Sequence, residues 1–163
     1  MVKQASVTWL GALLIAAAAA ILSPLPAAAQ AEPPAIEESY AVALIRDVLT
    51  AVNHGNWTGN YTVLRDYAAS DFAAANDPTR LAGLFTQIRA ERLDLLPVLV
   101  SDPILLRSEL LQQQTQMRLT GYFPLQPQHV SFDLGFERQG SRWLLLAISV
   151  GAFDPITAEE QAE

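Results

Sequence analysis

The chain has 163 residues, of which 51% are hydrophobic, and a formal net charge of −7. This length is sufficient for one domain with its own hydrophobic core. The acidic balance argues against binding to nucleic acid or to anionic lipid surfaces, since both require clustered positive charge. The chain contains no cysteine, which leaves neither a disulfide framework nor thiol chemistry.

The first 29 residues have the pattern of an export signal. Lys3 provides a positive start, residues 10–22 are apolar and uncharged, and Ala27–Ala29 matches a small-residue cleavage site before Gln30. The apolar stretch is shorter than the roughly 20 residues that span a bilayer. We therefore expect a periplasmic or secreted protein. If the segment were not cleaved, it would be a membrane anchor, and we expect no other membrane contact.

After the signal, the chain is expected to comprise a mobile lead-in (30–35), one α+β domain (36–153) and an acidic tail (154–163). The first helix is predicted over residues 36–53, with apolar residues at three- and four-residue spacing, and His54-Gly55 is expected to end it. A short helix follows at 61–68, with Val63, Leu64 and Tyr67 on its inward side. Ser70 is then expected to cap a turn that directs Phe72 into the core.

The third helix is predicted to start at Asp77-Pro78, an N-cap acid followed by proline at the first helical position, and to end near Arg92. From Leu95 the apolar period changes from 3.6 to two. Strands are predicted at 95–101, 104–112 and 115–123, followed by a hairpin over 129–150. The apolar run of the last strand suggests burial on both faces.

This order predicts three N-terminal helices packed on a curved antiparallel meander of four to five strands. It resembles the superfamily typified by nuclear transport factor 2, which includes SnoaL-like cyclases and ketosteroid isomerases. The resemblance rests on the helix order and on the final hairpin, residues 136–143 (FERQGSRW). It implies a cone-like sheet that holds a small molecule, and pairing of chains through the sheet. The sequence departs from the superfamily in having no extended segment before the Asp77-Pro78 helix.

No catalytic or metal-binding motif is evident. His54 and His129 lie far apart without ligand spacing, and phosphate-loop and nucleophile-elbow motifs are absent. We expect no cofactor and no metal. Asp47, Asp71 and His54 are the only loose candidates for acid–base chemistry. The inner face of the sheet is predicted to be entirely apolar, which favours a non-catalytic protein.

Two candidate sites follow from the pattern. A ligand pocket between helices and sheet would be lined by aromatic residues, although each tyrosine among them is also typical of a core residue. These residues are Tyr40, Tyr61, Tyr67, Phe85, Phe132 and Phe136. The outer face of the sheet would be either a solvated charged surface or an interface. Its candidate interface residues are Arg107, Glu109, Arg118, Tyr122 and Asp133, with Glu137 on the same face.

The leading hypothesis is an exported, non-catalytic domain that binds a small apolar ligand or a protein partner, with homodimerisation through the sheet as one form. One alternative is a SnoaL-like isomerase, dehydratase or cyclase acting on a small hydrophobic substrate. Another is a structural envelope accessory protein whose cone is filled by its own side chains.

Overall fold

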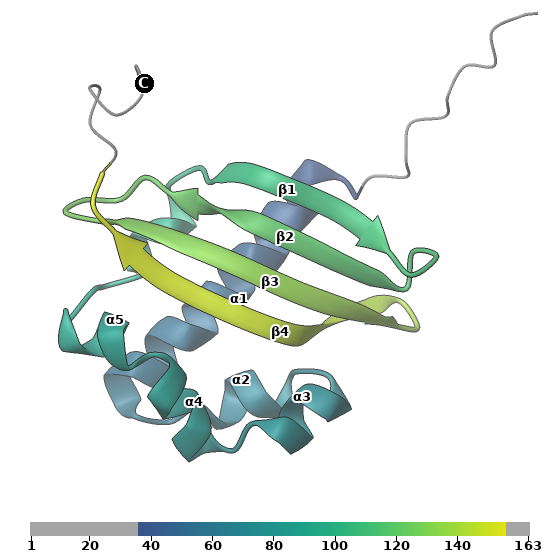
Figure 1. The fold of residues 1–163 in the computed structure, drawn as a ribbon, viewed down its shortest axis with the longest axis horizontal. Coiled ribbons are helices and arrows are strands. Elements are labelled where there is room, and N and C mark those ends of the chain that lie inside the picture. The colour runs from purple at the N-terminus through teal and green to yellow at the C-terminus, as the bar shows by residue number, and fades with distance from the viewer. Residues whose placement is uncertain (1–35, 156–163) are drawn as a thin grey trace, which may run out of the picture. The chain divides into compact units, whose positions relative to one another are not determined.

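The computed structural model describes residues 36–155 and shows an α+β domain in which an open four-stranded antiparallel sheet follows the helices (Figure 1). The predicted α+β class is confirmed, but residues 36–155 contain five α-helices rather than the three that were predicted. The helical elements are α1 (Glu38–Thr58), α2 (Thr62–Asp66), α3 (Ser70–Ala75), α4 (Pro78–Leu84), α5 (Thr86–Ala90) and the 3-10 helix η1 (Leu96–Leu99). The strands are β1 (Ile104–Leu111), β2 (Gln116–Phe123), β3 (His129–Gln139) and β4 (Arg142–Phe153).

The helices lie on one side of the sheet. In Figure 1, α1 runs diagonally behind the strands, and α2 to α5 gather beyond the β4 edge. Residues 36–155 include no helix that is both long and apolar enough to cross a bilayer. The expected signal segment, lead-in and most of the acidic tail lie outside the described residues.

Helix α1 continues past His54-Gly55, where the sequence predicted its end. Gly55 is buried inside the helix, and a Cβ atom there would come within 2.5 Å of the Tyr61 ring. The glycine therefore allows close packing of the Tyr61 ring against the helix. Gly59 ends the helix instead, with a φ of 72° and an N–H that donates to the Gly55 carbonyl.

The two short helices after α1 turn fewer apolar residues inward than predicted. Leu64 and Phe72 are buried, but Val63 and Tyr67 are 70% and 57% exposed. A helix of five residues has only one side against its neighbours, so Val63 remains outside. Ser70 is the first residue of α3 and makes no capping hydrogen bond, which corrects the prediction for this residue.

The helix predicted from Asp77 begins as expected but divides at Phe85. The Asp77 carboxylate accepts a 2.8 Å hydrogen bond from the Arg80 N–H, as expected for an N-cap. The Thr86 hydroxyl donates to the Gly83 carbonyl and the Arg89 guanidinium donates to the Ala82 carbonyl, each at 2.9 Å. These side chains occupy carbonyls near the junction, and the chain bends into a second short helix.

The strand predicted at 95–101 is wrong, because this segment forms η1. Pro97 lacks an N–H and lies in the first turn of η1. The segment is held against α1 by polar side chains: Asn53 accepts from the Leu95 N–H at 3.0 Å, and Arg46 donates to the Val98 carbonyl at 2.9 Å. These long-range bonds override the extended pattern of the local sequence.

The four strands follow chain order, β1-β2-β3-β4, with each neighbour antiparallel. In β2 and β3 buried and partly exposed residues alternate, and the inward set is apolar as predicted. Strand β4 is an edge strand. Leu145 is its only buried residue, so the prediction that both of its faces are covered is wrong. Its apolar run packs on the helices from one side and is partly exposed on the other.

Candidate binding surface on the open sheet face

The sheet has an outer face that no described helix covers, and we use this name for the side chains directed away from α1. Within residues 36–155 they include Arg107 and Glu109 on β1, Gln116, Arg118, Thr120 and Tyr122 on β2, His129, Ser131, Asp133 and Glu137 on β3, and Ala147, Ser149 and Phe153 on β4. Gly135 of β3 lies on the same face but has no side chain. The register places Arg107 opposite Thr120, Glu109 opposite Arg118 and Thr120 opposite Asp133. The residues proposed from the sequence as an interface therefore share one surface.

A charge pair occupies the middle of this face. The Arg118 Nε atom donates to Asp133 Oδ1 at 2.8 Å, and a second guanidinium nitrogen donates to Oδ2. The Thr120 hydroxyl donates to the same carboxylate at 3.3 Å. The hydrogen bond from Arg118 is the main reason that the pKa of Asp133 is lowered below its usual value. The side chains of Arg118 and Asp133 remain 46% and 35% exposed, so the pair is still accessible to a partner.

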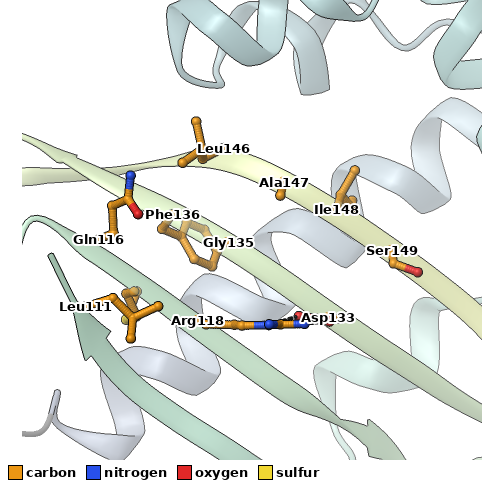
Figure 2. A pocket seen from close by; sticks show the side chains of 11 residues that line it. Leu111, Gln116, Arg118, Asp133, Gly135, Phe136, Leu146, Ala147, Ile148 and Ser149 are labelled. Carbon is orange, nitrogen blue, oxygen red and sulfur yellow. Dashed lines mark hydrogen bonds and ion pairs between the residues drawn. The ribbon is translucent and has the colours of Figure 1, made fainter.

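Beside this pair the face is hollowed. Figure 2 shows the side chains around a hollow of about 300 Å³ that lies over β2, β3 and β4 and is bordered by the end of β1. Gly135 has no side chain to fill it, and Ala147 lies opposite Gly135 in the register. Apolar side chains of Leu111, Leu146 and Ile148 line the hollow together with the polar groups of Gln116, Arg118, Asp133 and Ser149. The surface thus combines an apolar depression with an oriented charge pair.

One end of the outer face carries packed aromatic rings. The Tyr122 and His129 rings stack with centroids 5.4 Å apart, and Phe153 meets both at 5.6 Å and 5.2 Å in edge-on geometry. His129 Nδ1 lies 3.3 Å from the Leu125 carbonyl. His129 therefore belongs to an aromatic cluster of the sheet. Sequence reasoning had placed Tyr122 on this face but did not predict the cluster, because its members come from three different strands.

The six aromatic residues proposed as a ligand pocket do not surround one cavity. Tyr61 and Phe85 are buried at 0–1% exposure and stack with centroids 5.6 Å apart. Phe132 and Phe136 are each 2% exposed, and Phe132 packs against Phe123. Tyr40 and Tyr67 lie at the surface. The rings of the four buried residues lie in the core between the helices and the sheet.

A second depression lies between α1 and α2 and was not predicted. This groove of about 250 Å³ is lined by apolar side chains including Val48, Val63, Tyr67 and Leu145, and by the carboxylate-bearing Asp47. The Arg142 guanidinium lies 4.7 Å from the centre of the Tyr67 ring. The apolar side chains on the exposed side of α2 were the signal in the sequence that could have indicated this groove. The sequence pattern assigned them to the core instead.

The remaining acid–base candidates lie apart from one another. His54 is on α1 and Asp71 is on α3, and both are exposed. In the part of the chain that the structure describes, no group of three or more potential ligands is arranged to hold a metal ion. Comparison with protein-family models, curated proteins and solved structures gives no match to this chain.

Proposed function

We propose that this protein is an exported, non-catalytic binding domain that docks a protein partner on the outer face of its sheet. The observation that carries the proposal is the hollow above Gly135 beside the Arg118–Asp133 pair. Protein interfaces concentrate their binding energy where an apolar or aromatic anchor enters a depression and is surrounded by polar contacts. The hollow offers the depression, and the charge pair offers directed polar contacts.

The chemistry of this face favours a protein over a small molecule. The hollow is open and shallow, whereas small-molecule sites bury most of the ligand. An anchor side chain from a partner needs only a depression, because the surrounding flat surface supplies the rest of the contact. The buried aromatic rings between the helices and the sheet support the same conclusion, since they occupy the position that the sequence proposed for a ligand.

We also propose that the chain is a nuclear transport factor 2-like protein of the periplasm or of the secreted fraction. The support for the family is the order of helices followed by a four-stranded meander, together with the sequence resemblance. The support for export is the pattern of residues 1–29. Closure of the sheet into a cone is the family feature that remains a proposal.

Site-directed photocrosslinking in the producing cell tests the docking surface. A benzophenone amino acid at Ala147, which lines the hollow, is expected to give one adduct of defined mass. The control carries the same group at Ala74, an exposed residue of α3 on the helical side. The Arg118→Glu substitution should abolish the adduct formed from position 147. If neither position forms an adduct, or if both form the same adducts, the proposed surface is wrong.

The groove between α1 and α2 supports a second candidate function, the binding of a small apolar ligand. Its lining is mostly apolar, and Asp47 is an ionisable group beside it, which is the one feature that the enzyme alternative requires. Native mass spectrometry of gently purified protein tests binding. A retained ligand that is lost in Val63→Asp would support the groove. If the ligand is retained in that variant, or if none is present, this second function is contradicted.

A further inference from the structure

The two edges of the sheet differ in whether their outward backbone N–H and C=O groups form hydrogen bonds. At the β4 edge, the Leu145 carbonyl accepts a 2.9 Å hydrogen bond from the Ala69 N–H, which lies just before α3. At the β1 edge, the backbone hydrogen bonds within residues 36–155 connect the strand only to β2. Strand β1 therefore presents an open edge, and an open edge is a template for another strand.

The charges of β1 are arranged so that this strand complements itself. Arg107 and Glu109 are two residues apart, lie on the same face and approach within 3.5 Å. When two identical strands pair antiparallel, the numbers of the two residues that lie opposite each other add up to the same value all along the pair. With a two-fold axis at Ser108, Arg107 of the first copy faces Glu109 of the second, and Glu109 of the first copy faces Arg107 of the second.

We propose that two copies of this chain pair through their β1 edges, antiparallel and centred on Ser108, to form one continuous eight-stranded sheet. Opposite charges directly across an antiparallel pair stabilise it, and like charges destabilise it. Shifting the strands by two residues would place Glu109 opposite Glu109, or Arg107 opposite Arg107, and would leave the other charge of each copy without an opposite charge across the pair. The charges therefore select one register.

Exposed apolar side chains near the edge give the pairing a hydrophobic contribution. Leu106 is 70% exposed and Val100, just before β1, is 88% exposed, with Leu99, Ile104 and Leu111 also exposed. Burial of such side chains between two copies is favourable. A register irregularity between Leu105 and Arg107 limits regular pairing to the centre of the strand, so the apolar side chains must supply most of the contact area.

This pairing goes beyond the docking function proposed above and does not require it. A two-fold axis through an antiparallel strand pair runs perpendicular to the sheet. The outer faces of both copies consequently lie on the same side, and both hollows remain open to a partner. The edge thus joins two copies, while the face stays available.

Charge exchange tests the register. We expect the full-length wild-type chain to be a dimer in light scattering coupled to gel filtration. Arg107→Glu or Glu109→Arg alone places like charges opposite each other and should raise the dimer dissociation constant by at least about tenfold. The double variant R107E/E109R restores both opposite pairs and should dimerise as the wild type does. A monomeric wild type, or a double variant that stays as weak as the single variants, overturns the proposal.

A disulfide test distinguishes the edge from the face, because the chain has no cysteine of its own. Ser108→Cys places two thiols across the proposed axis and should give a disulfide-linked dimer under mild oxidation. Ser149→Cys, at another exposed serine beside the hollow, serves as the matched control and should stay monomeric on a non-reducing gel. If the Ser149→Cys variant forms a linked dimer and the Ser108→Cys variant does not, edge pairing is overturned, while docking on the outer face stays intact.

Discussion

The guanidinium of Arg118 holds the Asp133 carboxylate across two neighbouring strands, with Nε 2.8 Å from Oδ1. This relationship fixes a negative and a positive group at the centre of a face that is otherwise shallow and partly apolar. It also makes the stability of the domain depend on pH, because the pKa of Asp133 is lowered mainly by the hydrogen bond from Arg118.

The first prediction concerns the stability of the domain at low pH. An unpaired Asp has a pKa of about 3.9. Because the pKa of Asp133 is lowered in the folded state, its carboxylate stabilises the fold fully above the unpaired value. The contribution is lost as the pH falls below about 4 through the folded-state pKa. Asp133→Asn should therefore flatten the dependence of the unfolding free energy on pH below about 4, as measured by urea unfolding.

Asp102→Asn is the matched control for the acid prediction. Asp102 meets Arg46 at 3.4 Å, but its side chain is fully exposed, so solvent screens the pair. Its removal should leave the pH dependence as it is in the wild type. If D133N and D102N follow the same curve as the wild type, the pair makes no measurable contribution to acid stability.

The second prediction concerns Gly121, the glycine in the second half of β2. A Cβ atom on Gly121 would lie 2.2 Å from the Ile104 carbonyl oxygen and 2.9 Å from Phe132 Cζ. Because one of these neighbours is backbone, Gly121→Ala must push β1 away from β2. We expect a loss of at least about 3 kcal/mol in unfolding free energy, at the upper end of overpacking effects.

Gly83→Ala provides the comparison for Gly121. It lies in α4, where nothing is within 4 Å of an added Cβ. The substitution should stabilise the domain by up to about 1 kcal/mol, because alanine favours a helix over glycine. Thermal unfolding of both variants checks the pair, and equal effects would contradict the close approach at Gly121.

The third prediction concerns the buried side-chain amide of Asn53, which holds the segment before the sheet against α1. Asn53 is buried, accepts from the Leu95 N–H at 3.0 Å and donates to the Asp94 carboxylate at 3.1 Å. Asn53→Leu leaves the Leu95 N–H without its acceptor, which costs about 1–3 kcal/mol. Hydrogen exchange should become faster at the Leu95 amide. Unchanged protection there would contradict this role.

The fourth prediction concerns the side chain of Tyr61, which packs against the C-terminal part of α1. The Tyr61 hydroxyl donates to Asn56 Oδ1 at 2.6 Å, and burial raises the pKa of Tyr61. Tyr61→Phe keeps the ring stacked on Phe85 but removes the hydrogen bond, so we expect a loss of about 1 kcal/mol. Tyr61→Ala removes the ring and should cost about 3–5 kcal/mol. Equal losses in both variants would mean that the ring does not contribute through packing.

The sequence correctly predicted the elements whose formation depends on interactions between residues close together in the chain. The Asp77-Pro78 helix start and the β3 alternation were recognisable because a cap and a period of two act over a few residues. The α+β class followed from their order. The residues of the outer face were assigned to one side of the sheet for the same reason.

Long-range contacts decided what the sequence did not predict. Gly55 is typical of a helix end, but the Tyr61 ring needs the space beside it. The apolar 95–101 segment was predicted to be a strand, yet Asn53 and Arg46 hold it as a 3-10 helix. The hollow above Gly135 could not be foreseen, because it requires the register of β2, β3 and β4.

The hydrogen bond from the Ala69 N–H to the Leu145 carbonyl has a consequence for assembly. A sheet with two free margins could add copies without limit and grow into a filament. Here the β4 margin is occupied at Leu145, in the first third of the strand, by the chain's own backbone. Two-fold pairing through the opposite margin uses the β1 strand of both molecules at once, so this association closes at two molecules and makes a pair rather than a polymer.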